Sequence, residues 1–472
     1  MTRAAIAALL AGPTVLAFAT GGYPDAPRAW AGLVAWLLAA VGLAVGGLPR
    51  GRTAWLAVGG AAAYAAWTLL SVTWAPIAGS AWDAGQIAVL YLGAFVAAVT
   101  LLGDAAGRRA VEPALAAGTL VVVGYGLSDR LLPGLLTFQR SVTAEGRLEQ
   151  PLTYWNAMGV VAAIGLVLVM RLAADTRRPS WMRTIAAAAA APLGLGLSLT
   201  VSRGALFAAV AGVLTLIVAT RRREQLQAVL LAIAAGGLAS LVAAPFDGVT
   251  ALADPSAGEG AAVLAGLVVV MALAAWANRR LEPARPMRPL ALPRRSGLIA
   301  LALVAAGFAL ALVAGTDERA DAPLTPGAQR LTTLSSNRYE YWKVAGRAFG
   351  DQPLRGIGAG GWAVRWRAER PFAESARDAH SLYFQTAAEL GLVGLLALAA
   401  WFAGVVLAAR TALARAPDAA AGLAAVCAVW AAHVALDWDF QMPAATLPAV
   451  VAAGALVALA ATAPRRSAAP RA

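Results

Sequence analysis

His380, one of only two histidines in the 472-residue chain, lies in the segment RDAHSLYFQTAAELGLVG. Four arginines precede it, between residues 365 and 377. Nearby cations lower the pKa of an imidazole, and a neutral imidazole accepts a proton near pH 7. We therefore predict that His380 acts as a general base; the alternative interpretation is an ordinary loop histidine.

The second histidine, His433, precedes Asp437 by four residues in HVALDWDFQMP. Residues four apart share one face of a helix, so this spacing predicts a structural His–Asp pair. Asp437 and Asp439 also form a D-x-D pattern, which is similar to that of metal-dependent sugar transferases over three residues only. Asp437 is the alternative candidate for the base.

Two arginines occur where a cation is unexpected. Arg203, in LSLTVSRGAL, lies in a turn of a few residues between two apolar runs. A charge at such a membrane edge usually has a partner or a function, although a snorkelling loop arginine is the alternative. Arg147, in EGRLEQPLTYWNAMG, is a second candidate anion ligand. Beside it, Tyr154 and Trp155 fit an interfacial aromatic belt, and Asn156 fits a helix cap.

A helix is predicted at about residues 338–349, with Asn337 as N-cap and Glu340 completing a capping-box-like pair. Arg338 falls on the apolar side of this helix, four residues before Trp342. It is therefore a candidate buried anion ligand, the alternative being an arginine paired to an acid. The apolar stripe consists of Tyr341, Trp342, Ala345, Ala348 and Phe349, and the opposite face carries Glu340, Lys343 and Arg347.

Four glycines cluster in LRGIGAGGW, at residues 356, 358, 360 and 361. Such a cluster can cradle a phosphate with backbone N–H groups. Tight turns are the commoner reason for it, so we predict a turn here.

Membrane helices must position these residues, because 60% of the chain is hydrophobic and only 13% is charged. These values exclude an ordinary cytosolic protein and a disordered one. A crossing needs ~20 apolar residues, and we predict an all-α polytopic membrane protein with about 14 transmembrane helices (12–14). The apolar runs are 4–20, 29–47, 53–72, 85–102, 110–127, 156–174, 184–200, 204–220, 226–244, 261–277, 297–315, 387–409, 419–436 and 444–462.

The distribution of basic residues predicts the orientation. With the N-terminus in the cytoplasm, cytoplasmic segments hold 23 of the 38 basic residues and short outer loops hold five. This agrees with the positive-inside rule, so the net charge of +13 reflects orientation rather than nucleic-acid binding. The long segment 316–386 then lies outside.

The first apolar run contains Ala17-Phe18-Ala19, which also fits a signal-peptide cleavage site; we expect that this run is an uncleaved span. The single Cys427 excludes an internal disulfide and a thiolate metal site.

In their order along the chain, these motifs resemble the O-antigen ligase and O-antigen polymerase family of polytopic membrane glycosyltransferases. The resemblance spans roughly residues 140–440. It rests on YWNAMG, the SRG turn, the R…W…F.D.PL.GIG.GGW pattern and AHSLYFQTAAELGLVG, although Asn more often stands where this chain has Ser381. It implies three regions: N-terminal transmembrane helices at 1–130, a ligase-like core at 131–440 that includes the outer loop 316–386, and a last helix with a basic tail at 441–472.

The resemblance implies transfer of a glycan from an undecaprenyl-pyrophosphate carrier to an acceptor hydroxyl, on the outer face of the cytoplasmic membrane, in cell-surface polysaccharide biosynthesis. Direct attack would invert the anomeric centre, and neither a metal nor another cofactor is expected. The expected partners are the lipid-linked donor, a glycan or lipid-glycan acceptor and membrane lipid, but no nucleic acid. The implied catalytic residues are His380, Arg203 and Arg338, and the implied substrate-binding residues are Arg147, Tyr154, Asn156 and Asp437.

Two other functions fit a protein with this many spans. One is a flippase or transporter of lipid-linked oligosaccharides, against which we find no mid-span acid suited to ion coupling and no repeated half. The other is a peptidoglycan-type polymerase, which uses the same lipid carrier. The sequence also leaves open whether the acceptor is another molecule, as for a ligase, or the growing chain, as for a polymerase.

Overall fold

The computed structural model describes residues 2–49, 51–136, 138–281, 289–314 and 337–462, and these residues form helices and connecting loops without a β-strand. All fourteen predicted apolar runs fall on helices, whose ends differ from the predicted ones by several residues. The long helices are α1 (Thr2–Ala17), α2 (Asp25–Val45), α3 (Arg52–Leu70), α4 (Ala78–Leu101), α5 (Ala105–Leu131), α6 (Trp155–Ala174), α7 (Ser180–Leu199), α8 (Arg203–Thr220), α9 (Arg223–Ala243), α11 (Ala257–Leu281), α12 (Ser296–Ala314), α15 (Leu382–Arg415), α16 (Pro417–His433) and α17 (Pro443–Thr462).

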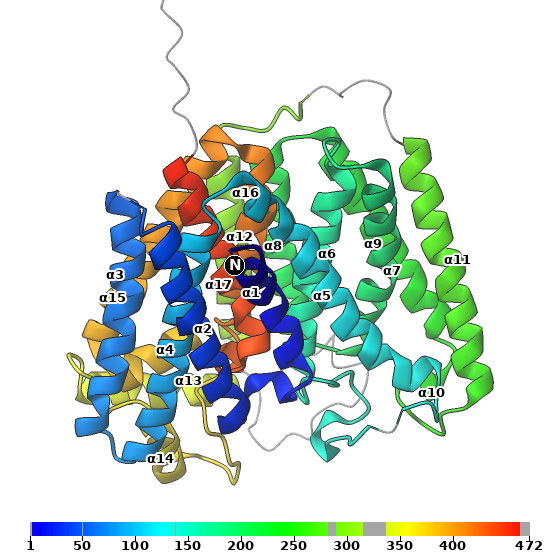
Figure 1. Ribbon diagram of the computed structural model, residues 1–472. Coiled ribbons are helices and arrows are strands. Elements are labelled where there is room, and N and C mark those ends of the chain that lie inside the picture. Colours follow the sequence, from blue (N-terminus) through cyan, green and yellow to red (C-terminus); the bar gives the residue numbers. More distant parts are fainter. Residues whose placement is uncertain (1, 50, 137, 282–288, 315–336, 463–472) are drawn as a thin grey trace, which may run out of the picture.

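Eleven of the described helices are long and apolar enough to cross a membrane, which fits a polytopic membrane protein. The shorter α1, α12 and α16 account for the difference from fourteen, so the count of fourteen crossings stays a prediction. Three short helices, α10 (Asp247–Thr250), α13 (Arg338–Asp351) and α14 (Gly361–Glu369), lie at the lower end of the bundle in Figure 1. The N-terminal part of the long segment 316–386 lies outside the described residues.

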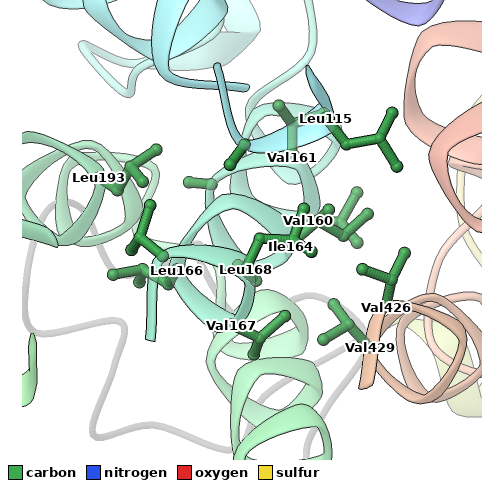
Figure 2. Close-up of a cluster of buried hydrophobic side chains, with 14 of the residues drawn as sticks. Leu115, Val160, Val161, Ile164, Leu166, Val167, Leu168, Leu193, Val426 and Val429 are labelled. Atoms are coloured by element: carbon green, nitrogen blue, oxygen red, sulfur yellow. The ribbon is translucent and has the colours of Figure 1, made fainter. Parts of the chain in front are cut away.

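Helix α6 forms the centre of the bundle, because its apolar stretch is buried along its whole length. Val160, Val161 and Ile164 of α6 face Leu115 of α5, Leu193 of α7 and two valines of α16 in Figure 2. In contrast, α2, α9 and α11 expose large apolar side chains such as Trp30, Leu241 and Trp276. Such side chains suit a lipid environment, where helices rather than open backbone must span the apolar layer.

Small residues bring several helices into close contact. A Cβ atom on Gly194 of α7 would lie only 2.4 Å from the Cα of Gly236 in α9. Likewise, a Cβ on Gly404 of α15 would lie 2.5 Å from the backbone N of Ala57 in α3. Lipid tails are as apolar as the helices, so van der Waals packing through small residues is what holds membrane helices together.

Helix α15 is interrupted near its start, at Gly391, whose φ of 63° is left-handed and favours glycine. The segment before α14 enters this break. The N–H of Gly358 donates to the carbonyl of Glu389 at 2.8 Å, and the N–H of Leu392 donates to the carbonyl of Pro353 at 2.8 Å. The segment that leads into α14 is therefore fixed to a membrane helix by backbone hydrogen bonds.

The glycine cluster forms the turn that makes this contact. Gly356, Gly358 and Gly360 all have positive φ. A Cβ on Gly356 would lie 2.3 Å from the backbone of Glu389, so protein atoms already occupy the space beside it. The Glu389 carboxylate accepts a hydrogen bond from the N–H of Trp362 at 3.1 Å, at the start of α14. These contacts support the turn interpretation rather than a phosphate cradle.

Candidate active site

A cavity of about 510 Å³ lies where α6, α8 and α13 begin. Its wall comes from segments that are far apart in the sequence, which the fold brings to the same end of the bundle. Six of the seven residues implied by the resemblance line it, and the seventh, Asp437, lies directly behind its wall. The six are Arg147, Tyr154, Asn156, Arg203, Arg338 and His380.

Asp437 joins three parts of this wall. Its carboxylate accepts hydrogen bonds from the hydroxyl of Tyr154 at 2.8 Å and from Nδ2 of Asn156 at 2.7 Å. It also forms an ion pair with Arg338, at 2.6 Å, and accepts from the N–H of Trp438 at 2.9 Å. Only 1% of Asp437 is exposed, so these four protein groups, rather than solvent, stabilise its carboxylate.

The four donors make Asp437 a poor base. Burial alone would raise the pKa of this carboxyl, but Arg338 and the two histidines outweigh burial and hold the pKa below its ordinary value. A carboxylate that is stabilised as an anion has little tendency to take a proton. The geometry therefore favours a positioning role for Asp437 over the alternative role as base.

His380 presents one ring nitrogen to the protein. Its Nδ1 lies 3.0 Å from the backbone carbonyl of Asp378, and its ring packs against that of Tyr341, with 5.1 Å between the centroids. A carbonyl can only accept, so Nδ1 carries the hydrogen and Nε2 of the neutral ring carries the lone pair. This is the tautomer that a general base on the cavity wall requires.

The pKa of His380 is lowered from its ordinary value, as the sequence predicted, but mainly for another reason. Burial is the largest cause, because it disfavours the charged ring. Arg338 lowers the pKa further, whereas Asp437 raises it. The pKa of His380 is therefore set mainly by burial and by the Arg338–Asp437 ion pair, rather than by the four arginines that precede His380 in the sequence.

The loop that carries His380 is fixed by polar side chains that the sequence analysis missed. The buried Asp378 carboxylate accepts from Nε2 of Gln385 at 3.2 Å and from Nε2 of Gln441. Burial raises the pKa of Asp378 to about 6. Ser381, where the family more often has Asn, is the N-cap of α15 and accepts from the N–H of Phe384. The sequence did contain a signal for this polar contact, because Ser381 and Gln385 are four residues apart and share one face of the helix.

The arginines of the cavity are held in different ways. Arg147 donates to the carbonyls of Ala144 at 2.7 Å and Thr143 at 2.6 Å, and its guanidinium lies 3.7 Å from the ring centre of Trp155. Arg203 is the first residue of α8. A further arginine, Arg377, also lines the cavity, and the sequence analysis did not assign it a role there. Arginine is the residue best suited to bidentate binding of phosphate groups.

Part of the chain matches a known protein family. Residues 256–399 match the model of the family described as O-Antigen ligase. The match supports the O-antigen ligase family for this part of the chain, which is about a third of its length. No curated protein matches the chain.

The family match covers α11 to α14 and the first half of α15. It therefore includes Arg338 and His380 but not Arg147, Arg203 or Asp437, which come from the flanking segments. The match, together with the apolar helices, indicates an O-antigen ligase-type function in polysaccharide biosynthesis, in a multi-pass membrane protein.

Three sequence predictions for residues that flank the matched region need correction. His433 does not pair with Asp437 at helical spacing, because α16 ends at His433; its Nδ1 instead lies 3.2 Å from Asp439. Asn156 does not cap α6, since Tyr154 occupies the N-cap position. Tyr154 is a buried part of the cavity wall, where its hydroxyl donates to Asp437, rather than an exposed member of an interfacial belt.

The start of α13 was predicted in position but not in detail. Asn337 is the N-cap, yet its side chain makes no capping bond and donates to Glu374 at 2.8 Å instead. Glu340 pairs with Lys343 rather than closing a capping box. Arg338 forms an ion pair with Asp437, as the alternative interpretation of this residue expected, and its role as an anion ligand stays a prediction.

Proposed function

We propose that this chain transfers a glycan from an undecaprenyl-pyrophosphate carrier to an acceptor hydroxyl on the outer face of the cytoplasmic membrane. One observation carries the proposal: arginines from three distant segments and a histidine in its base-competent tautomer line the same cavity. Such an arrangement suits an acyl or glycosyl transfer in which an anionic group leaves and a hydroxyl attacks. The match of residues 256–399 to the O-antigen ligase family favours glycosyl transfer over acyl transfer.

The arginines would stabilise the leaving group. As the anomeric carbon–oxygen bond breaks, its electron pair passes to the pyrophosphate, which gains negative charge. We assign this charge to Arg203 and Arg338, with Arg147 binding the same group from the other wall. Asp437 would hold Arg338 in orientation before the donor arrives, with Tyr154 and Asn156 supporting Asp437. Because guanidinium groups supply the positive charge, we propose that transfer needs no metal ion.

His380 would activate the acceptor. Its Nε2 takes the proton from the acceptor hydroxyl while the hydroxyl oxygen bonds to the anomeric carbon. The pyrophosphate leaves from the opposite side of that carbon, so the configuration inverts. The proton ends on the imidazole, and the products are the glycosylated acceptor and undecaprenyl pyrophosphate.

The cavity would face outward. Under the positive-inside rule, the sequence assigns five basic residues to the short loops on the side of Arg147 and Arg203, and 23 to the segments on the cytoplasmic side. The arginines at this end also have internal partners: Arg28 pairs with Asp25 and Asp83, and Arg140 pairs with Asp129. Because these arginines are paired with carboxylates, their charge opposes transfer of the loops across the membrane less than unpaired charges would.

A transfer assay with purified protein tests the proposal. The protein is incubated with a lipid-linked glycan donor and a candidate acceptor, and both glycosylated product and released undecaprenyl pyrophosphate are measured. Transfer that yields both in equal amounts supports the proposal. Extension of the donor glycan itself would indicate a polymerase, and transfer to a separate acceptor a ligase. Movement of the intact donor across vesicles without a new glycosidic bond would instead indicate a flippase and refute the proposal.

A further inference from the structure

A second cavity, of about 290 Å³, lies at the end of the bundle opposite the candidate active site. Helix α6 connects the two: its first residues line the active-site cavity, and Asp175, which follows its last residue, lines the second. With 20 residues, α6 separates them by about 30 Å. The second cavity is lined by Ala105, Arg108, Arg109, Glu112, Asp175, Arg177, Arg178, Pro179, Asp418, Ala419 and Leu459.

The carboxylates of this second cavity are already neutralised by arginines. Asp418 pairs with Arg222 at 2.8 Å and with Arg177 at 3.4 Å. Asp175 pairs with Arg177 at 3.0 Å, and Glu112 lies 3.5 Å from Arg178. A further arginine, the buried Arg171, lies 3.3 Å from Asp175 and 3.7 Å from Asp418.

The cluster nevertheless retains positive charge. Six arginines (108, 109, 171, 177, 178 and 222) stand against four carboxylates (104, 112, 175 and 418), which leaves an excess of two positive charges, since 6 − 4 = 2. Arg109 is exposed and half of the Arg177 side chain is exposed, so cations stand at the mouth of the cavity. Arg108 is held beside them by the backbone carbonyls of Leu102 and Gly103.

We propose that this second cavity binds the phosphate group of an anionic phospholipid head group, on the membrane face opposite the glycan transfer. Guanidinium groups match phosphate oxygens bidentately, and basic pockets between membrane helices are suited to such head groups. The wall also offers Leu459, Ala105 and Pro179, apolar surface that a soluble anion does not use and the acyl chains of a lipid do. The site is independent of the proposed transfer reaction.

Binding of phosphatidylglycerol to the purified full-length protein in detergent tests this inference, with phosphatidylcholine as the zwitterionic lipid whose net charge is zero. The double variant Arg109→Gln/Arg177→Gln removes two cations at the mouth while Arg171, Arg178 and Arg222 still neutralise the carboxylates. The matched control is Arg52→Gln, an exposed arginine at the start of α3 outside the cavity lining. We expect the double variant to bind phosphatidylglycerol about tenfold more weakly or worse, because hydrogen bonds to charged groups are lost, and the control to bind normally.

Competition by inorganic phosphate distinguishes the source of the phosphate. Displacement of the lipid only at phosphate concentrations far above those of the cell supports a lipid site. Phosphate binding that is itself lost in the double variant, without any lipid preference, supports the same cavity but assigns it a soluble ligand. Equal binding of phosphatidylglycerol by wild type and double variant, with correctly folded protein by thermal unfolding, overturns the inference.

Discussion

His380→Asn is the sharpest test of the proposed chemistry, because the backbone of His380 limits the useful substitutions. Its φ of 51° lies in the left-handed region, where Asn is tolerated far better than most residues. The Asn amide can also donate to the carbonyl of Asp378, as Nδ1 of the imidazole does. The variant therefore keeps the loop and removes only the nitrogen that would accept the proton.

The expected loss follows from the role of a general base. Its removal typically lowers the rate by ~10²–10⁴-fold, or about 3–5 kcal/mol of transition-state stabilisation. The lost ring contact with Tyr341 is worth roughly 0.5–1.5 kcal/mol and affects folding stability, not the chemical step. Donor binding depends on the arginines, so we expect the dissociation constant of the lipid-linked donor to stay within about threefold of wild type.

The assay measures single-turnover glycan transfer against pH, alongside donor binding. The base must be neutral, and the pKa of His380 is lowered below its ordinary value of 6.5. Wild-type activity should therefore be complete near neutral pH and fall only as the pH drops below 6.5 and through this pKa. The variant should lack this acid limb, because its remaining activity does not depend on the imidazole.

Two results would refute this reasoning. One is a His380→Asn variant that transfers glycan at a rate within threefold of wild type. The other is an unchanged acid limb in that variant, since the limb would then belong to another group. If Asp437→Asn lost transfer while His380→Asn kept it, the base would be Asp437 despite its four hydrogen-bond donors.

The other predictions concern charge and topology. Arg203→Lys should lower transfer by at least tenfold although the charge is kept, because lysine lacks the bidentate fork; near-full activity would exclude phosphate binding by Arg203. Arg338→Gln should move the acid limb of the pH profile to higher pH, since removal of this cation raises the pKa of His380; a shift to lower pH would contradict the geometry. Reporter fusions after Gln329 and after Arg466 should report opposite sides of the membrane, and the orientation is wrong if both report the same side.

The overall architecture could be predicted because a membrane imposes simple rules on the sequence. Each crossing needs a long apolar helix, and all fourteen apolar runs are helical in the structure. The gathering of Arg147, Arg203 and Arg338 also followed from topology, because all three lie in segments that the sequence predicts on the outer side of the membrane. Such a prediction needs only the direction of each helix and not the packing between helices.

Contacts that depend on where a helix stops could not be predicted. The spacing of His433 and Asp437 indicates a pair only if the helix continues, but α16 ends at His433 without a glycine or proline to mark the end. The chain then turns, so that Asp437 meets Tyr154 and Asn156, about 280 positions away, while His433 meets Asp439. No local pattern in a single sequence encodes a contact over that separation.

This turn explains how one carboxylate serves the whole cavity. Asp437 draws Arg338 of α13 and Asn156 of α6 onto the link between α16 and α17, so three segments that share no local sequence pattern are fixed relative to one another. Arg338 is consequently oriented before a donor binds, and the ordering of this side chain does not oppose donor binding. The same carboxylate raises the pKa of His380 while Arg338 lowers it. The ion pair therefore places a cation at the cavity, while its two opposite charges largely cancel in their effect on His380. Burial is then the main reason that the imidazole stays neutral.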